Sequence, residues 1–206
     1  MNCNYSRLIS ITLVLFYQFN LQGNDTLSYR LSLAFYKDLS DTYYGGDLLA
    51  GEFKLCKTWY GGEISYGQFQ SANEYNYEIT IEEINSTVTI PINEVTVMKS
   101  GSLSFFIRPV KYKWIATDLS LGLVYCRAYR SRLINCYYSY DLINKEFVYL
   151  YREYALENRT HFGFQVGVDI NFISTHHLGL DLKARIQNLN HGGTFFFVGG
   201  GISVNF

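Results

Sequence analysis

The sequence lacks an excess charge of either sign, and neither its N-terminal segment nor any later one is an apolar run long enough for a membrane helix. Lysine plus arginine number 17 against 18 aspartate plus glutamate, so the formal net charge is −1. A nucleic-acid-binding protein would be strongly basic, and we therefore expect no nucleic acid among the partners. A transmembrane helix needs about 20 consecutive apolar residues. If the mature protein enters a membrane, it must do so with strands.

Cysteine is also scarce, with only Cys3, Cys56, Cys126 and Cys136. Their wide and irregular spacing fits neither a disulfide framework nor a zinc site. Cys126 and Cys136 could pair across a loop, and small buried thiols facing an interior are the alternative. No phosphate-binding glycine loop is present, because the glycines at 199–201 lie inside a strand-like segment. We expect no metal and no cofactor.

Aromatic residues and glycine are abundant, with 19 Tyr, 15 Phe and 17 Gly against 2 Pro and 2 Met. This composition favours strands joined by turns, and it predicts an all-β protein. The 48% of hydrophobic residues argues against disorder. A length of 206 residues suits one compact domain.

The first 23 residues differ from the rest of the chain. Arg7 supplies a positive start, and Leu8–Phe19 is a short apolar run of the length that a signal peptide uses. Gly23 offers a small residue near the end of this segment for cleavage. The sequence therefore predicts a signal peptide over residues 1–23 and a single domain over residues 24–206.

The remaining chain contains segments in which apolar and small or polar residues alternate with a period of two, as in strands. Eight segments show this pattern, and in the fourth we expect a β-bulge at Ser100–Ser102. The eight segments are Leu27–Phe35, Leu49–Leu55, Tyr60–Gln68, Val95–Ile107, Leu119–Tyr129, Phe162–Phe172, Leu178–Asn188 and Thr194–Phe206.

Alternation alone does not say whether the apolar face points inward, as in a secreted lipocalin-like binder of apolar ligands, or outward into lipid. The polar face is rich in Gly and Ser and carries four acidic and four basic residues, which suits a narrow barrel interior. We predict that these residues form an ion-pair network that plugs the barrel, with an anion-selective constriction as the weaker alternative. The predicted network residues are Arg30, Glu52, Lys54, Glu63, Asp169, Asp181, Lys183 and Arg185.

The predicted connections partly alternate between short and long. Cys56–Trp59 and Ile173–His177 are short, the link Arg108–Asp118 is intermediate, and the links over residues 71–94 and 130–161 are long. Barrels of the outer membrane alternate short periplasmic turns with longer external loops. We therefore expect 71–94 and 130–161 to be external loops, with strands that extend the barrel beyond the bilayer as the alternative.

The end of the chain carries a further signal. Phe206 is the last residue, and Val204, Ile202 and Val198 precede it on the same face. This segment resembles the C-terminal strand of small outer-membrane β-barrel proteins such as the OmpA-, OmpX- and OmpW-like barrels. The resemblance implies an eight-stranded antiparallel up-and-down transmembrane β-barrel in a Gram-negative type of outer membrane. It also implies that Phe206 is the signal read by the barrel-assembly machinery, and that the partners include outer-membrane lipid.

The sequence does not point to catalysis. His161 with Thr160 is the only conceivable start of an acyl-transfer site, while His176, His177 and His191 fall in predicted turns. We therefore expect no enzyme, with a lipid-modifying outer-membrane enzyme as the alternative. The long loops are rich in tyrosine, an amphipathic contact residue. They favour a structural or surface-interaction role with a possible extracellular partner.

Overall fold

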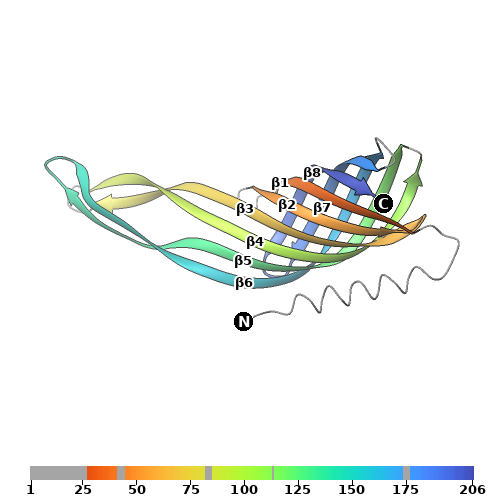
Figure 1. The fold of residues 1–206 in the computed structure, drawn as a ribbon. Coiled ribbons are helices and arrows are strands. Elements are labelled where there is room, and N and C mark those ends of the chain that lie inside the picture. The colour runs from red at the N-terminus through yellow and green to blue at the C-terminus, as the bar shows by residue number, and fades with distance from the viewer. Residues whose placement is uncertain (1–26, 41–44, 82–84, 113, 174–176) are drawn as a thin grey trace.

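Each alternating segment of the sequence forms a strand in a computed structural model of the protein, and the strands close into one antiparallel barrel (Figure 1). The structure describes residues 27–40, 45–81, 85–112, 114–173 and 177–206, so the predicted signal peptide 1–23 lies outside the described residues. In this part of the chain no helix is long and apolar enough to cross a membrane. The strands are β1 (Ser28–Asp38), β2 (Gly46–Cys56), β3 (Tyr60–Ile81), β4 (Ser86–Lys111), β5 (Ile115–Asp141), β6 (Glu146–Ile173), β7 (Leu178–Leu189) and β8 (Gly193–Asn205).

The barrel closes where β1 pairs with β8, so that the first and last strands cover each other's edges. Leu31 lies opposite Val204, and Leu33 lies opposite Ile202. Beyond the last strand, the backbone N–H of Phe206 donates to the carbonyl of Tyr29 at 2.8 Å. Closure is physically required in hydrocarbon, because each unpaired backbone group there costs several kcal/mol.

The apolar faces of the strands point outward, as the sequence predicted. Phe164 and Leu180 are 51% and 58% exposed, whereas Asp181 and Arg185 are 3% and 2% exposed. An exposed apolar surface of this kind suits lipid. The predicted fold class is confirmed, and the secreted lipocalin-like alternative, which needs the apolar faces inside, is excluded.

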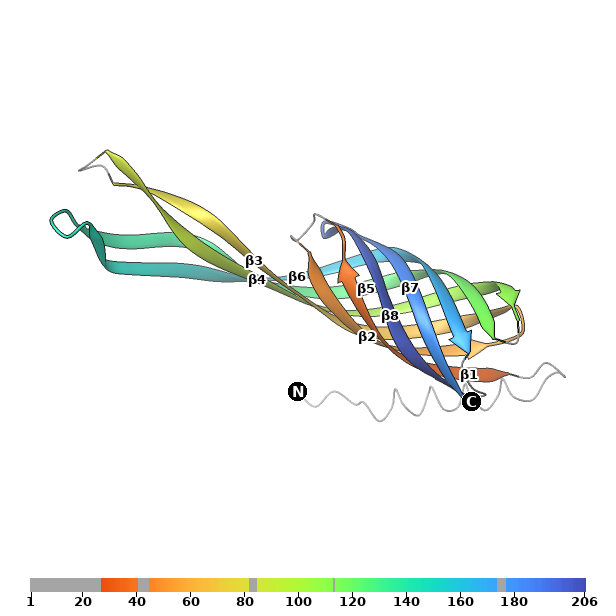
Figure 2. The same ribbon diagram turned by 90° about the horizontal axis from the view of Figure 1, so that it is seen from above.

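The start of β1 and the end of β8 lie at one end of the barrel, which we call the terminal end, and two long ribbons leave the opposite end, which we call the ribbon end (Figure 2). Of the two expectations for 71–94 and 130–161, the loops were wrong and the strands that extend the barrel were right, because most of these residues are strand. The β3–β4 ladder continues from Ser71 to Ile81, and the β5–β6 ladder continues to Asp141. At about 3.3 Å per residue each ribbon extends roughly 35–40 Å beyond the barrel. Thr and Ile are frequent in 71–94 and Tyr is frequent in 130–161, and all three residue types favour strands.

The expected β-bulge at Ser100–Ser102 is also absent, since β3–β4 and β4–β5 pairing runs through it without a shift in register. The irregularity lies instead between Ile107 and Val110, on either side of Pro109. Proline has no N–H to donate to a β-ladder, so the register shift between β4 and β5 occurs at a position where a backbone hydrogen bond is already missing. The strand then continues to Lys111, and the β4–β5 connection is shorter than predicted.

The possible Cys126–Cys136 disulfide does not form. Both residues are free thiols, as is Cys56. Cys126 lies in the apolar part of the barrel interior, whereas Cys136 belongs to the core between the two ribbons. The two sites lie on different parts of the molecule, and the alternative of small thiols turned inward describes Cys56 and Cys126 correctly.

Candidate functional site

The barrel interior near the terminal end is a layer of charged side chains. Period-2 alternation turns every second residue of each strand inward, which places acids and bases from seven strands in one small volume. All eight residues of the predicted network are buried there. They are Arg30 of β1, Glu52 and Lys54 of β2, Glu63 of β3, Asp169 of β6, and Asp181, Lys183 and Arg185 of β7.

Lys54 lies at the centre of this layer and contacts three carboxylates. Its Nζ is 3.3 Å from Glu63 Oε2, 3.2 Å from Asp118 Oδ2 and 2.5 Å from Asp169 Oδ2. The same ammonium lies 5.1 Å from the centre of the Phe106 ring. Because none of these groups reaches water, each charge depends on its neighbours for stabilisation.

A second set of contacts joins β7 to β2 and β3. Lys183 Nζ lies 2.5 Å from Glu52 Oε2, and Arg185 Nη2 lies 3.0 Å from Glu52 Oε1 and 3.2 Å from Glu63 Oε1. The hydroxyl of Tyr36 also donates to Glu52 Oε1 at 2.5 Å. Residues more than a hundred positions apart in the sequence are thereby connected across the barrel.

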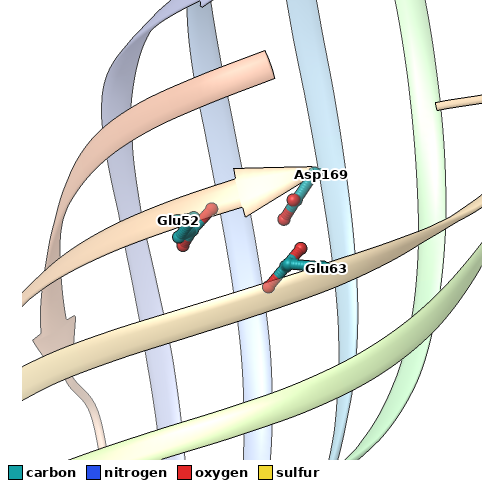
Figure 3. Close-up of side chains that lie close together, drawn as sticks. All are labelled: Glu52, Glu63 and Asp169. Carbon is teal, nitrogen blue, oxygen red and sulfur yellow. The ribbon is translucent and has the colours of Figure 1, made fainter. Parts of the chain in front are cut away.

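Glu52, Glu63 and Asp169 point toward one another in Figure 3 and lie close enough to hold a cation by distance alone. The layer already supplies the compensating charge, because Lys54, Lys183 and the Arg185 guanidinium contact these carboxylates. A metal ion would have to displace these protein cations. The arrangement therefore fits a structural ion-pair layer better than a metal site.

The sequence analysis missed two members of the layer, Arg108 and Asp118. Arg108 Nε donates to Asp118 Oδ1 at 2.7 Å, and Arg108 Nη2 donates to Oδ2 at 3.2 Å, a two-pronged ion pair. Both residues had been assigned to the link between two strands. The signal was present, since Arg108 continues the inward alternation of Ser104 and Phe106 beyond Ile107, where the predicted strand ended.

Above the charged layer, toward the ribbon end, lies an apolar layer, so the expectation of a polar interior is wrong at this level of the barrel. Tyr36, Phe69, Phe195 and Phe197 are buried side by side, and the Phe69 ring lies 5.7 Å and 5.9 Å from the rings of Phe195 and Phe197. Small residues make room for them, because a Cβ at Gly46 would lie 2.4 Å from the Phe69 ring. Large and small inward residues together fill the narrow barrel.

The mouth of the barrel at the ribbon end holds a small polar cavity of about 50 Å³, lined in part by Arg130, Arg159, His161 and His191. His161 is buried, and its Nδ1 lies 3.0 Å from the carbonyl oxygen of Asn190.

The conceivable acyl-transfer pair is not assembled at this mouth. His161 is turned inward, whereas the adjacent Thr160 is exposed. Neighbouring strand residues point to opposite faces, so the two side chains diverge. His177 lies at the terminal end, and His176 lies outside the described residues.

Beyond the mouth, the two ribbons pack against each other. Ile79, Ile90 and Ile92 of the β3–β4 ribbon form a buried cluster, and side chains of the β5–β6 ribbon, among them Leu133 and Leu150, pack on it. A strand ribbon that has its own hydrophobic contacts is more rigid than a loop. We call the two packed ribbons the extension.

An ion pair between Glu94 and Arg130 links the two ribbons at the base of the extension. Glu94 accepts hydrogen bonds from Arg130 Nη2 at 2.8 Å, from the backbone N–H of Leu133 at 3.3 Å and from the Tyr75 hydroxyl at 3.2 Å. Burial raises the pKa of Glu94, but these donors and the Arg130 charge outweigh it, so the pKa lies below its usual range. Burial and the nearby Glu94 carboxylate raise the pKa of Tyr75.

The outer surface of the β5–β6 ribbon carries exposed tyrosines. Tyr137 and Tyr151 lie opposite each other in register, and their rings stack with centres 6.3 Å apart. Tyr149 is likewise about half exposed. A stacked, exposed aromatic pair on a rigid ribbon presents contact area at little entropic cost.

Comparison with known proteins yields no sequence relative, since no family model and no curated protein matches the chain. Solved structures do match in fold. The barrel is similar to Neisserial surface protein A (12% identity, TM-score 0.56, 90% of this chain and 100% of that chain). It is also similar to Ail, the attachment invasion locus protein of Yersinia pestis, solved with the heparin analogue sucrose octasulfate (12% identity, TM-score 0.53, 87% and 99%). A major outer membrane protein of Thermus thermophilus matches with 11% identity and a TM-score of 0.50, covering 88% and 100%.

At these identities the likeness shows the fold. Together with the apolar outer face of the strands, this fold defines the chain as an eight-stranded outer-membrane β-barrel protein. The outer-membrane location predicted from the sequence is confirmed with it.

Proposed function

We propose that the protein is a closed outer-membrane anchor that holds a rigid extension outside the cell, and that this extension binds another protein. The observation that carries the proposal is the extension itself, two strand ribbons that pack on a hydrophobic cluster of their own. A closed barrel does not require these two ribbons, since β7 and β8 are joined at the same end by the short turn 190–192.

The filled interior supports the part of the proposal that concerns closure. The charged layer pairs its acids and bases across the barrel, and the aromatic layer of Tyr36, Phe69, Phe195 and Phe197 lies above it. An eight-stranded barrel has an interior that side chains can fill. We therefore expect no stable conductance when the protein is reconstituted in a planar bilayer, and a steady open channel would contradict closure.

The charge of the extension indicates what kind of partner it binds. In the described part of the β3–β4 ribbon, Glu74 and Glu78 are exposed acids, Glu94 is paired with Arg130, and the segment 71–96 has no lysine or arginine, while the β5–β6 ribbon carries both signs. A surface of negative potential repels polyanions and attracts basic surfaces. The sulfated ligand in the Ail structure is thus a poor guide here, and a protein with a basic and aromatic surface fits better.

The proposal includes the route to the membrane. Residues 1–23 direct export, and Phe206 is the signal for barrel assembly, as the resemblance of the last strand to outer-membrane barrels implies. Removal of Phe206 should then lower the amount of folded barrel in the outer membrane of expressing cells. An unchanged amount, measured by the faster migration of unboiled protein on a gel, would argue against that role.

The binding role is tested with liposomes that contain the full barrel, applied to an array of purified secreted and cell-surface proteins. A variant with Tyr137, Tyr149 and Tyr151 replaced by Ser should lose the proteins that the wild type binds. The matched control is Tyr77→Ser, which removes an exposed tyrosine from the other ribbon and should leave binding intact. Equal binding by wild type and triple variant would refute the proposal. Conversion of labelled lipid by the same liposomes would favour the enzymatic alternative.

A further inference from the structure

The lipid-facing surface has a groove near the terminal end, between β2, β3 and β4. It has a volume of about 270 Å³, and apolar side chains form most of its wall, among them Leu55 and Phe105. The groove exists because Gly62 lies between these two residues in register, where other positions of the same face carry large side chains. A Cβ at Gly62 would meet only the Ser104 carbonyl oxygen, at 3.9 Å.

A cation is held at the edge of this groove. Lys57 is one of the lining residues, and its Nζ lies 5.7 Å from the centre of the Tyr60 ring. Tyr60 in turn stacks on Phe105, with ring centres 6.1 Å apart. The backbone N–H of Lys57 donates to the Tyr60 carbonyl at 2.8 Å, which fixes the turn. Among the described residues no carboxylate lies within ion-pair distance of Lys57, so its charge faces the groove without an acidic partner.

The position of the groove along the barrel suits a lipid headgroup. Trp59 and Trp114, both exposed, lie in the connections of the same end. Tryptophan and tyrosine gather where hydrocarbon meets the headgroups. The groove therefore opens toward acyl chains, while Lys57 lies at the level of phosphates.

We propose that this groove binds one anionic phospholipid of the leaflet at the terminal end, with an acyl chain over Gly62 and the phosphate beside Lys57. Neither the groove over Gly62 nor the Lys57 charge alone defines a site, because the whole lipid-facing surface is apolar and single surface lysines are common. The missing side chain and the unpaired cation occur together, and an anionic phospholipid matches both. Under the proposed orientation the terminal end is periplasmic, so this is the phospholipid leaflet.

The test is native mass spectrometry of the full barrel, released from micelles that contain equal amounts of phosphatidylglycerol, phosphatidylethanolamine and lipid A. We expect wild-type protein to retain one phosphatidylglycerol in clear preference to the other two. Gly62→Leu fills the groove without a backbone clash and should lower that retention at least fivefold. Lys57→Gln removes the charge and should abolish the preference over phosphatidylethanolamine, since a lysine near an anionic surface contributes about fivefold in affinity.

Gly51→Leu is the matched control, because Gly51 also faces outward and a Cβ there meets nothing within 4 Å. It should retain phosphatidylglycerol as the wild type does. The migration of unboiled protein on a gel confirms that each variant is folded. The proposal is overturned if the Gly62 and Gly51 variants retain equal amounts, or if the wild type holds phosphatidylethanolamine or lipid A as well as phosphatidylglycerol.

Discussion

The central cation of the charged layer offers the sharpest test of the interior. Lys54→Met keeps the length and volume of the side chain and removes its charge. The ammonium is fully buried and contacts Glu63, Asp118 and Asp169 at 2.5–3.3 Å. The substitution leaves these carboxylates with one cation fewer and no access to water.

The magnitude follows from that burial. Removing one partner from a buried ion pair costs about 3–5 kcal/mol, because the remaining charge stays uncompensated. Lys37 provides the matched control, since its Nζ lies 2.9 Å from Asp47 but the two side chains are 57% and 51% exposed. An exposed pair contributes about 0–1 kcal/mol. We therefore expect Lys54→Met to destabilise the barrel by at least about 2 kcal/mol more than Lys37→Met does.

The assay is reversible urea unfolding of the barrel in lipid vesicles, followed by tryptophan fluorescence. The double variant with Lys54→Met and Asp169→Asn should lose less free energy of unfolding than the sum of the two single variants, because it restores the charge balance. If Lys54→Met and Lys37→Met have the same effect, or if the single losses simply add, the layer does not work as a coupled network.

Three further predictions concern other parts of the molecule. Phe197→Ala should lower the free energy of unfolding by about 3–5 kcal/mol in the same urea assay, since it opens a cavity in the aromatic layer. Gly199→Ala should destabilise the barrel by at least about 1 kcal/mol, because its Cβ would lie 2.0 Å from a backbone oxygen. Gly62→Ala is the control and should be nearly neutral in the same assay. Because the folded-state pKa of Glu94 lies below its unfolded value, its contribution is present at neutral pH and is lost as the pH falls through the folded pKa. The protection factors of amides in the extension, which correct for the intrinsic pH dependence of hydrogen exchange, should therefore fall at acid pH and fall less in Glu94→Gln, and an equal fall in both would contradict the contact with Arg130.

Strand positions and their orientation could be predicted because lipid on one side and a packed interior on the other impose a strict period of two. Phe162–Phe172 and Leu178–Asn188 show this most clearly, and both lie within β6 and β7 as expected. Eight of the ten residues of the charged layer could be found in the same way. Which acid meets which base could not, since Lys183 and Glu52 are 131 positions apart and meet only after the barrel closes.

The extension was predicted only as an alternative, and the aromatic layer was not predicted. In the β5–β6 ribbon both sides are partly in water, so residues 130–161 show no sharp contrast between faces and also fit a loop. In the last strand the alternation did turn Phe195 and Phe197 inward, but an interior of glycine, serine and ions left no role for them. The height of each inward side chain along the barrel axis is known only from the structure, and it shows that apolar and charged groups occupy separate layers.

The most direct test of the account asks what the outer face touches. Trp59 and Trp114 are replaced by Phe, and one tryptophan is introduced at Leu180 or, for comparison, at Tyr149 of the extension. In vesicles of brominated phospholipid the tryptophan at position 180 should be strongly quenched and protected from aqueous acrylamide, and the one at position 149 should behave in the opposite way. Acrylamide quenching at position 180 without quenching by bromine would contradict the lipid-facing barrel.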